Sequence, residues 1–192
     1  NKYTNLSTAT RGPPFQPRQL PPVSPSSPPS LQVTNPFYST LLGIQEWPTE
    51  TLVQIVTSLT TGGLSAVSRC FYDPSYLVNS WALFTQSGFW HSWAASHGIT
   101  PKVSSSKRLE IEGLLAITFL VAVLCQQNKV EGGTFTLYCL TKQLAHQLNN
   151  LQYSSVSKAL LDHGDLLSEF RYQKQHLESF CTVSILYLDL GD

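Results

Sequence analysis

The chain reads Arg108-Leu109-Glu110-Ile111-Glu112-Gly113-Leu114-Leu115-Ala116 and then stays largely apolar to residue 125. Two carboxylates at the start of an apolar run predict a long helix, from about residue 107 to 126, with its acids in the first turns. The apolar part is much shorter than the roughly 20 residues that a bilayer span needs. A helix buried across a sheet is therefore favoured over a membrane span.

Short segments with strand-like patterns flank this helix on both sides. The predicted strands are 64–68, 81–84, 89–96, 134–139 and 181–188, and further helices are expected from 49, from 141 to 149 and from 165. Residues 150–164 are ambiguous, with room for one more helical turn. The resulting order β-β-β-α-β-α-α-β predicts an α/β fold, in which a mixed five-stranded sheet carries helices on its faces.

The N-terminal part differs sharply in composition. Nine of the 12 prolines lie within the first 36 residues, and such a segment sustains neither helix nor ladder hydrogen bonds. We therefore predict a disordered Pro-rich linker over 1–46 and one folded domain over 47–192. Pro22, Pro25 and Pro28 have P-x-x-P spacing, which fits an SH3-type partner. A tether between two domains explains the same composition.

Charge is scarce in this chain. Charged residues make up 12% of it and the formal net charge is zero, against a usual charged fraction of about a quarter. No global basic field is available to attract a polyanion, so nucleic-acid binding requires a local patch. The candidate patch consists of Lys102, Lys107 and Arg108, with Trp90 and Trp93 nearby in the predicted third strand.

The cysteines and the N-terminus suggest the cellular setting. The four cysteines are widely spaced and form no C-x-x-C pair, which argues against a zinc site and for buried thiols. The first ten residues are polar and resemble no secretory signal, so an intracellular location, in cytoplasm or nucleus, is expected. Because the sequence begins with Asn1 and contains no methionine, we expect a piece of a longer chain.

Five short motifs occur in a distinctive order. They read Ala66-Val67-Ser68-Arg69-Cys70-Phe71 with Asp73-Pro74 and Trp81 after it, the helix motif quoted above, Tyr138-Cys139-Leu140-Thr141-Lys142, Asp165-Leu166-Leu167-Ser168-Glu169-Phe170-Arg171, and Tyr187-Leu188-Asp189-Leu190-Gly191-Asp192. This order resembles the ribonuclease H-like domain of retroelement (reverse transcriptase-associated) polyproteins. The family motifs read A-V-S-D-G-S, R-A-E-x-x-G-L-L-A, Y-C-D-N-K, D-L-L-x-E-x-R and H-V-K-G-H-x-D. The resemblance covers roughly residues 49–192 and implies a C-terminally truncated copy.

The resemblance implies a magnesium-dependent hydrolase of RNA–DNA hybrids, but two of its acids are replaced. Such hydrolysis uses two divalent ions about 4 Å apart, held by several converging carboxylates. Arg69 and Leu140 stand where the family has aspartates, and Glu110 remains. Arg69 places a permanent positive charge where a dication should bind. We therefore expect a catalytically inactive domain, a pseudoenzyme that retains weak nucleic-acid binding.

Two alternatives stay open at this point. In the first, the chain is an active magnesium-dependent RNA–DNA hybrid endonuclease that uses Glu110, Asp73 and Asp189, with Glu110 and Asp73 as metal ligands. In the second, it is a non-catalytic interaction module whose Pro-rich arm binds partners. Glu110 also has a purely structural interpretation, because an acid in the first turn complements the helix dipole. The spatial arrangement of Arg69, Glu110 and Leu140 bears directly on the choice.

Overall fold

The computed structural model describes residues 31–42, 48–73, 76–85, 88, 90–97, 106–150 and 163–191, without the side chains of 40, 70–73, 76–79 and 90–97. Three sequence predictions therefore lie outside the described residues: the P-x-x-P segment, Lys102 and the ambiguous stretch 151–162. The indole rings of Trp90 and Trp93 also lie outside them.

A five-stranded mixed sheet forms the centre of the fold. Its strands are β1 (Leu64–Asp73), β2 (Tyr76–Phe84), β3 (Trp90–His97), β4 (Thr134–Cys139) and β5 (Thr182–Tyr187), in the order β3-β2-β1-β4-β5. β1, β2 and β3 pair antiparallel, whereas β4 lies parallel to both β1 and β5. Short connections allow the antiparallel strands to pair directly, and the parallel pairs require helical crossovers. The predicted mixed α/β sheet with helices is confirmed.

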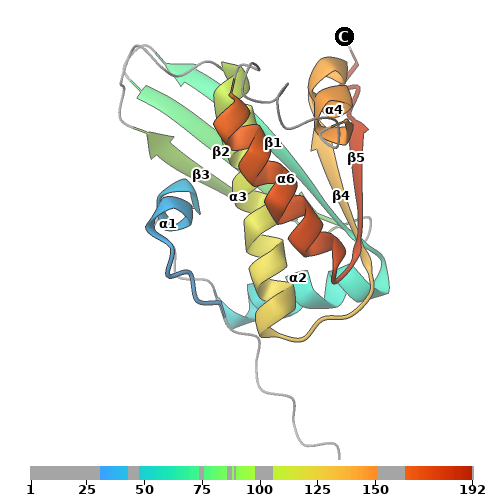
Figure 1. Ribbon diagram of the computed structural model, residues 1–192. Helices are drawn as coiled ribbons and strands as arrows, with labels where there is room; N and C mark the ends of the chain where they lie inside the picture. The colour runs from blue at the N-terminus through green and yellow to red at the C-terminus, as the bar shows by residue number, and fades with distance from the viewer. Residues whose placement is uncertain are drawn as a thin grey trace, which may run out of the picture.

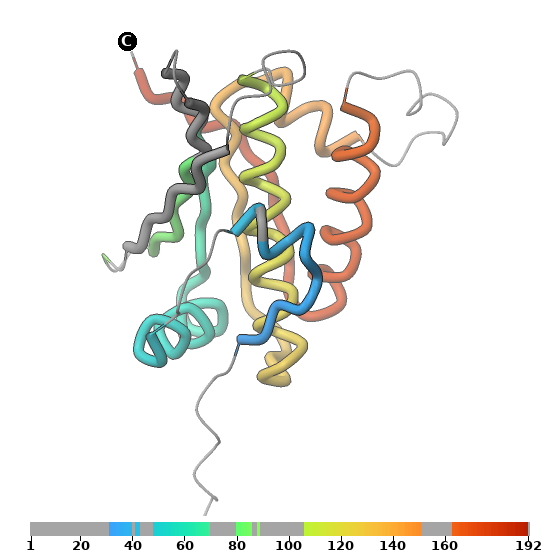
Figure 2. Tube along the Cα trace, turned by 90° about the vertical axis from the view of Figure 1, so that its left-hand side faces the viewer, coloured from blue at the N-terminus to red at the C-terminus, as the bar shows by residue number. Residues whose placement is uncertain are grey.

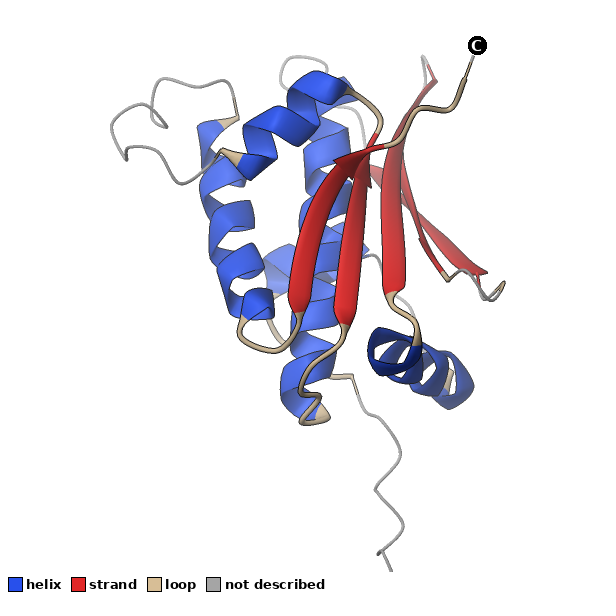
Figure 3. Ribbon diagram, turned by 90° about the vertical axis from the view of Figure 1, so that its right-hand side faces the viewer, coloured by secondary structure: helices blue, strands red, loops and turns tan. Residues whose placement is uncertain are grey.

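The helices gather mainly on one side of this sheet (Figure 1; Figure 3). They are α1 (Pro36–Leu42), α2 (Thr49–Thr61), α3 (Ser106–Gln127), α4 (Lys142–Asn149) and α6 (Gly164–Glu178). Figure 3 shows α3, α4 and α6 together on one face of the strands, while α2 crosses the lower end of the sheet. The C-terminal end of α2 lies so close to the start of β4 that a Cβ on Gly133 would be 2.1 Å from the carbonyl oxygen of Leu59.

The core lies between the sheet and α3. On β1, Leu64, Ala66 and Ser68 are buried, while the intervening residues are more exposed and end with the exposed Arg69. This alternation is that of a strand with one face against a helix layer. Within the described residues, α3 is the one helix long and apolar enough to cross a membrane, and 78% of its most apolar window is buried inside the domain. Its burial fits the predicted core helix.

Three boundary predictions are wrong: those of the N-terminal linker, of the first strand, and of the second strand, which begins at Tyr76 and not at residue 81. The disordered linker was predicted to extend to residue 46, yet residues 31–42 are ordered and include α1. Tyr38, Leu41 and Leu42, at helical spacing, give this segment a buried apolar stripe that its proline content obscured. The first strand also runs beyond the predicted residue 68 to Asp73, because β2 begins at Tyr76 and pairs with it along its whole length.

Candidate functional site

Glu110 lies near the N-terminal end of α3, where this helix passes the C-terminal end of β4. Its side chain is 8% exposed, and its Oε1 accepts a hydrogen bond of 3.1 Å from the backbone N–H of Leu140. Leu140 immediately follows the last residue of β4. The helix motif and the fourth-strand motif of the sequence therefore meet in space, 30 residues apart in the chain.

Arg69 belongs to the same edge through the register of the parallel strands. Val67 of β1 pairs with Tyr138 of β4, and Arg69 and Leu140 each lie two residues further along their strands. Parallel strands end at the same edge of a sheet, so these two positions are neighbours across the β1–β4 pair. The guanidinium of Arg69 is exposed. The structure thus brings Glu110 and Leu140 into contact and places Arg69 at the neighbouring position of β1, on the face of the sheet away from the helix layer.

Burial makes the Glu110 carboxyl harder to ionise. Loss of hydration raises its pKa, while the hydrogen bond from Leu140 and the charge of Lys107 lower it, and burial dominates. The neighbouring thiol of Cys139 is affected as well, since burial and then the charge of Glu110 raise its pKa to about 12. These surroundings disfavour negative charge.

The residues present do not fit a pair of magnesium ions. Within the described part of the chain, no group of three or more His, Cys, Asp or Glu side chains could hold a metal ion. Magnesium prefers an octahedral set of oxygen ligands, and the two-ion arrangement needs several carboxylates at one point. The edge where Glu110 lies offers instead a guanidinium at Arg69 and an aliphatic side chain at Leu140.

Asp73 and Asp189, the two acids that the sequence offered as substitutes, do not join Glu110. Asp73 lies further along β1, and Asp189 accepts a local hydrogen bond after β5. Asp73 is the last residue of β1 and pairs with Tyr76, so it lies in the extended strand and not in a turn; its side chain is outside the description. Four residues of strand, about 13 Å at roughly 3.3 Å per residue, separate it from Arg69. The exposed Asp189 follows β5, and its Oδ1 accepts a hydrogen bond of 3.1 Å from the N–H of Gly191.

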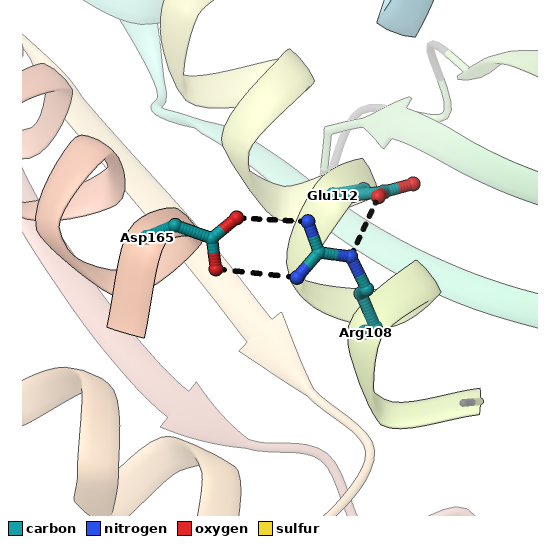
Figure 4. A network of polar contacts seen from close by, with 3 residues as sticks. All are labelled: Arg108, Glu112 and Asp165. Carbon is teal, nitrogen blue, oxygen red and sulfur yellow. Dashed lines mark hydrogen bonds and ion pairs between the residues drawn. The ribbon is translucent and has the colours of Figure 1, made fainter. Parts of the chain in front are cut away.

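The predicted nucleic-acid patch is only partly available. Arg108 donates two hydrogen bonds to Asp165 of α6, of 3.2 and 2.9 Å, and its Nε lies 3.4 Å from a carboxylate oxygen of Glu112 (Figure 4). These contacts raise the pKa of Arg108, and the Arg108 guanidinium lowers the pKa of Asp165. Arg108 therefore ties α3 to α6 and would have to break this network to bind a phosphate. Lys107, one residue before it, is half-buried beside Glu110.

Sequence reasoning missed the groups that surround the start of α4. The hydroxyl of Thr141 accepts a hydrogen bond of 3.2 Å from Leu144 N–H and caps the helix. The ammonium of Lys142 lies 5.3 Å from the ring centre of Tyr187, a cation–π distance. The pairing of Cys139 with Tyr187 in the β4–β5 register creates this contact. No local sequence pattern signals it, because the two residues belong to different motifs.

Comparisons with known proteins return solved structures alone, since no protein-family model and no curated protein matches the chain. The ribonuclease H1 of Halobacterium salinarum is 14% identical, covers 67% of this chain and 87% of its own, and gives a TM-score of 0.46. The N-terminal ribonuclease H domain of a Mycobacterium tuberculosis protein, solved as a fusion with maltose-binding protein, is 12% identical over 66% and 87%, with a TM-score of 0.43. LC11 ribonuclease H1, in complex with an RNA/DNA hybrid, is 9% identical over 67% and 85%, with a TM-score of 0.45.

Proposed function

We propose that this chain is a ribonuclease H-like domain of retroelement origin that no longer hydrolyses nucleic acid. The observation that carries the proposal is the C-terminal end of β4: Glu110 lies against Leu140, and Arg69 is the neighbouring position on β1. The five motifs in their order support the family assignment, and the sheet order β3-β2-β1-β4-β5 agrees with it. Two of the three positions at this edge lack a carboxylate.

Electrostatics explains why the replacements abolish the reaction. Two-ion hydrolysis requires several carboxylates converging on one point, and the replacements at positions 69 and 140 remove two of the three that the family places there. Glu110 supplies one carboxylate, one oxygen of which already accepts the N–H of Leu140. A single acid cannot hold two dications, so neither a metal-activated water nor a stabilised leaving oxygen is expected.

Weak nucleic-acid binding is the activity that we propose remains. Lys107 supplies charge near the N-terminal end of α3, and Lys102 precedes it by five residues in the sequence. A double-stranded backbone is recognised mainly through phosphate contacts of such cations. An RNA–DNA hybrid is the proposed ligand class. Because few cations are present, binding should be weak and its dependence on salt shallow. We place this function inside the cell.

A metal-dependent cleavage assay tests the proposal directly. The chain is incubated with a fluorescently labelled RNA–DNA hybrid in Mg²⁺ or Mn²⁺, with an active ribonuclease H as positive control. We expect no cleavage above the protein-free background. Cleavage by the wild-type chain that disappears in Glu110→Gln would overturn the proposal and restore the active-enzyme alternative.

A gain-of-function variant makes the reasoning sharper. Arg69→Asp with Leu140→Asp should convert the edge into a site with three carboxylates, and calorimetry should then detect saturable Mn²⁺ binding that the wild type lacks. Adding Glu110→Gln to the double variant should weaken this binding. If the double variant folds but binds no more Mn²⁺ than the wild type, these positions do not converge on a metal site.

A further inference from the structure

The segment 31–42 packs on the outside of the helix layer, upstream of the region that carries the family resemblance. Figure 2 shows α1 directly in front of α3. We use the term α1-docking face for the four residues that receive this segment, namely Phe119 and Gln127 of α3 and Glu169 and Gln173 of α6. Among the described elements, α3 makes the most extensive contact with α1.

Tyr38 is the central anchor on this face. Its ring is 2% exposed and stacks on Phe119 with 3.6 Å between ring centres and 5° between planes. Its hydroxyl donates a hydrogen bond to Oε1 of Glu169. The same oxygen also accepts a hydrogen bond of 3.2 Å from Nε2 of Gln173. The α1-docking face therefore combines an aromatic surface with a carboxylate acceptor placed for a phenol.

Further contacts fix the register of the segment. The N–H of Gln32 donates to Oε1 of Gln127 and the carbonyl of Gln32 accepts from its Nε2, both at 3.0 Å. Leu41 and Leu42 are also buried. Together with Tyr38 they form the pattern Y-x-x-L-L, whose i, i+3 and i+4 spacing is typical of a short helix bound by one face. Phe37, by contrast, is 45% exposed.

We propose that the α1-docking face is a binding site for short helices with the pattern Y-x-x-L-L, and that residues 31–42 of this chain occupy it in cis. The segment is a reversible strap, so a chain whose own strap is weakened binds the same peptide in trans. The face selects tyrosine over phenylalanine, because without the hydroxyl the carboxylate of Glu169 loses a hydrogen-bond donor.

Physical reasons favour reversible docking over permanent incorporation. A helix of 7 residues is too short to be stable alone, so its order depends on the contacts with α3 and α6. The buried cluster centres on the sheet, α3 and α6, where Phe135, Leu137 and Phe170 are fully buried, and Tyr38, Leu41 and Leu42 of the strap join it at its margin. The strap adds no strand or crossover to the sheet.

A peptide titration tests the proposal. A synthetic peptide of residues 31–42, labelled with fluorescein through a spacer at its N-terminus, is titrated with the full chain carrying Tyr38→Ala, and anisotropy is recorded. We expect saturable binding to this chain and at least tenfold weaker binding to the wild type, whose own strap occupies the face. The matched control chain, Val53→Ala, removes a 42% exposed apolar side chain on α2 and should behave as the wild type does.

Peptide variants and an independent measurement cover every outcome. A peptide with Tyr38→Ala should not bind, and one with Tyr38→Phe should bind at least tenfold more weakly than the natural peptide. Equal binding to wild-type and Tyr38→Ala chains, or no binding to a folded Tyr38→Ala chain, would overturn the proposal. A Tyr38→Ala chain that fails to fold would also refute it. Hydrogen exchange on the wild type should show α1 amides exchanging at least tenfold faster than those of α3, and equal rates would contradict reversibility.

Discussion

Replacing Gly133 with alanine tests the packing of α2 against the sheet. Gly133 has φ +104° and its added Cβ would lie 2.1 Å from the carbonyl oxygen and 2.7 Å from the carbonyl carbon of Leu59. Gly132, the adjacent residue, also has a positive φ of +80°, but a Cβ there meets nothing within 4 Å. The pair therefore separates backbone strain, which both substitutions cause, from steric overlap, which only one causes.

The expected magnitudes follow from these two terms. A positive φ costs a residue with a Cβ about 1–2 kcal/mol, which is the whole effect expected for Gly132→Ala. In Gly133→Ala the overlapping atoms must also separate by roughly 1 Å, and such overpacking costs about 1–3 kcal/mol more. Local relaxation is restricted by two backbone hydrogen bonds. The Gly133 carbonyl accepts a hydrogen bond of 3.0 Å from the N–H of Thr182, and the N–H of Gly132 donates one of 2.8 Å to the carbonyl of Phe180.

Urea denaturation followed by circular dichroism measures the difference. With a slope of about 1–3 kcal/mol/M, an additional 2 kcal/mol lowers the midpoint by about 1 M in Gly133→Ala relative to Gly132→Ala. A difference below about 0.5 kcal/mol in unfolding free energy between the two variants would refute the reasoning, since it would mean that α2 does not approach β4 as closely as the backbone indicates.

The remaining predictions concern polar groups. Asp165→Asn should lower the unfolding free energy at pH 7 by about 1 kcal/mol. Because Arg108 lowers the pKa of Asp165, the ion pair stabilises the fold above about pH 4, and this contribution is lost as the pH falls through the pKa of Asp165 in the folded state. Urea denaturation at pH 7 and at pH 3 measures the difference. Glu110→Gln should stabilise the fold at pH 8, because burial raises the pKa of Glu110. The wild type gains stability as pH falls and its carboxyl is protonated, so the advantage of the variant should shrink towards pH 4.5; an advantage independent of pH would contradict this. Tyr38→Phe should cost about 1–3 kcal/mol, since the half-buried Glu169 carboxylate loses one of its two hydrogen-bond donors. An unchanged melting temperature would show that this hydrogen bond contributes nothing.

Some features of the candidate site could be predicted from local sequence, and others could not. The position of Glu110 near the start of a buried helix followed from an acidic turn before an apolar run. The juxtaposition of Arg69 and Leu140 followed from the family motifs, and the parallel register of β1 and β4 accounts for it. By contrast, the engagement of Arg108 with Asp165, 57 residues away, could not be read from the charge pattern, which suggested a phosphate contact.

By itself, the sequence determined the identity and order of the main elements, because the periodicity of apolar residues is a local property that burial imposes on helices and strands. The extent of β1 to Asp73, the docking of Tyr38 on α3 and α6 and the pairing of Arg108 were decided only by tertiary structure. Each of these depends on a partner distant in the chain, whose contribution to the free energy exists only once the chain has folded and brought the two together.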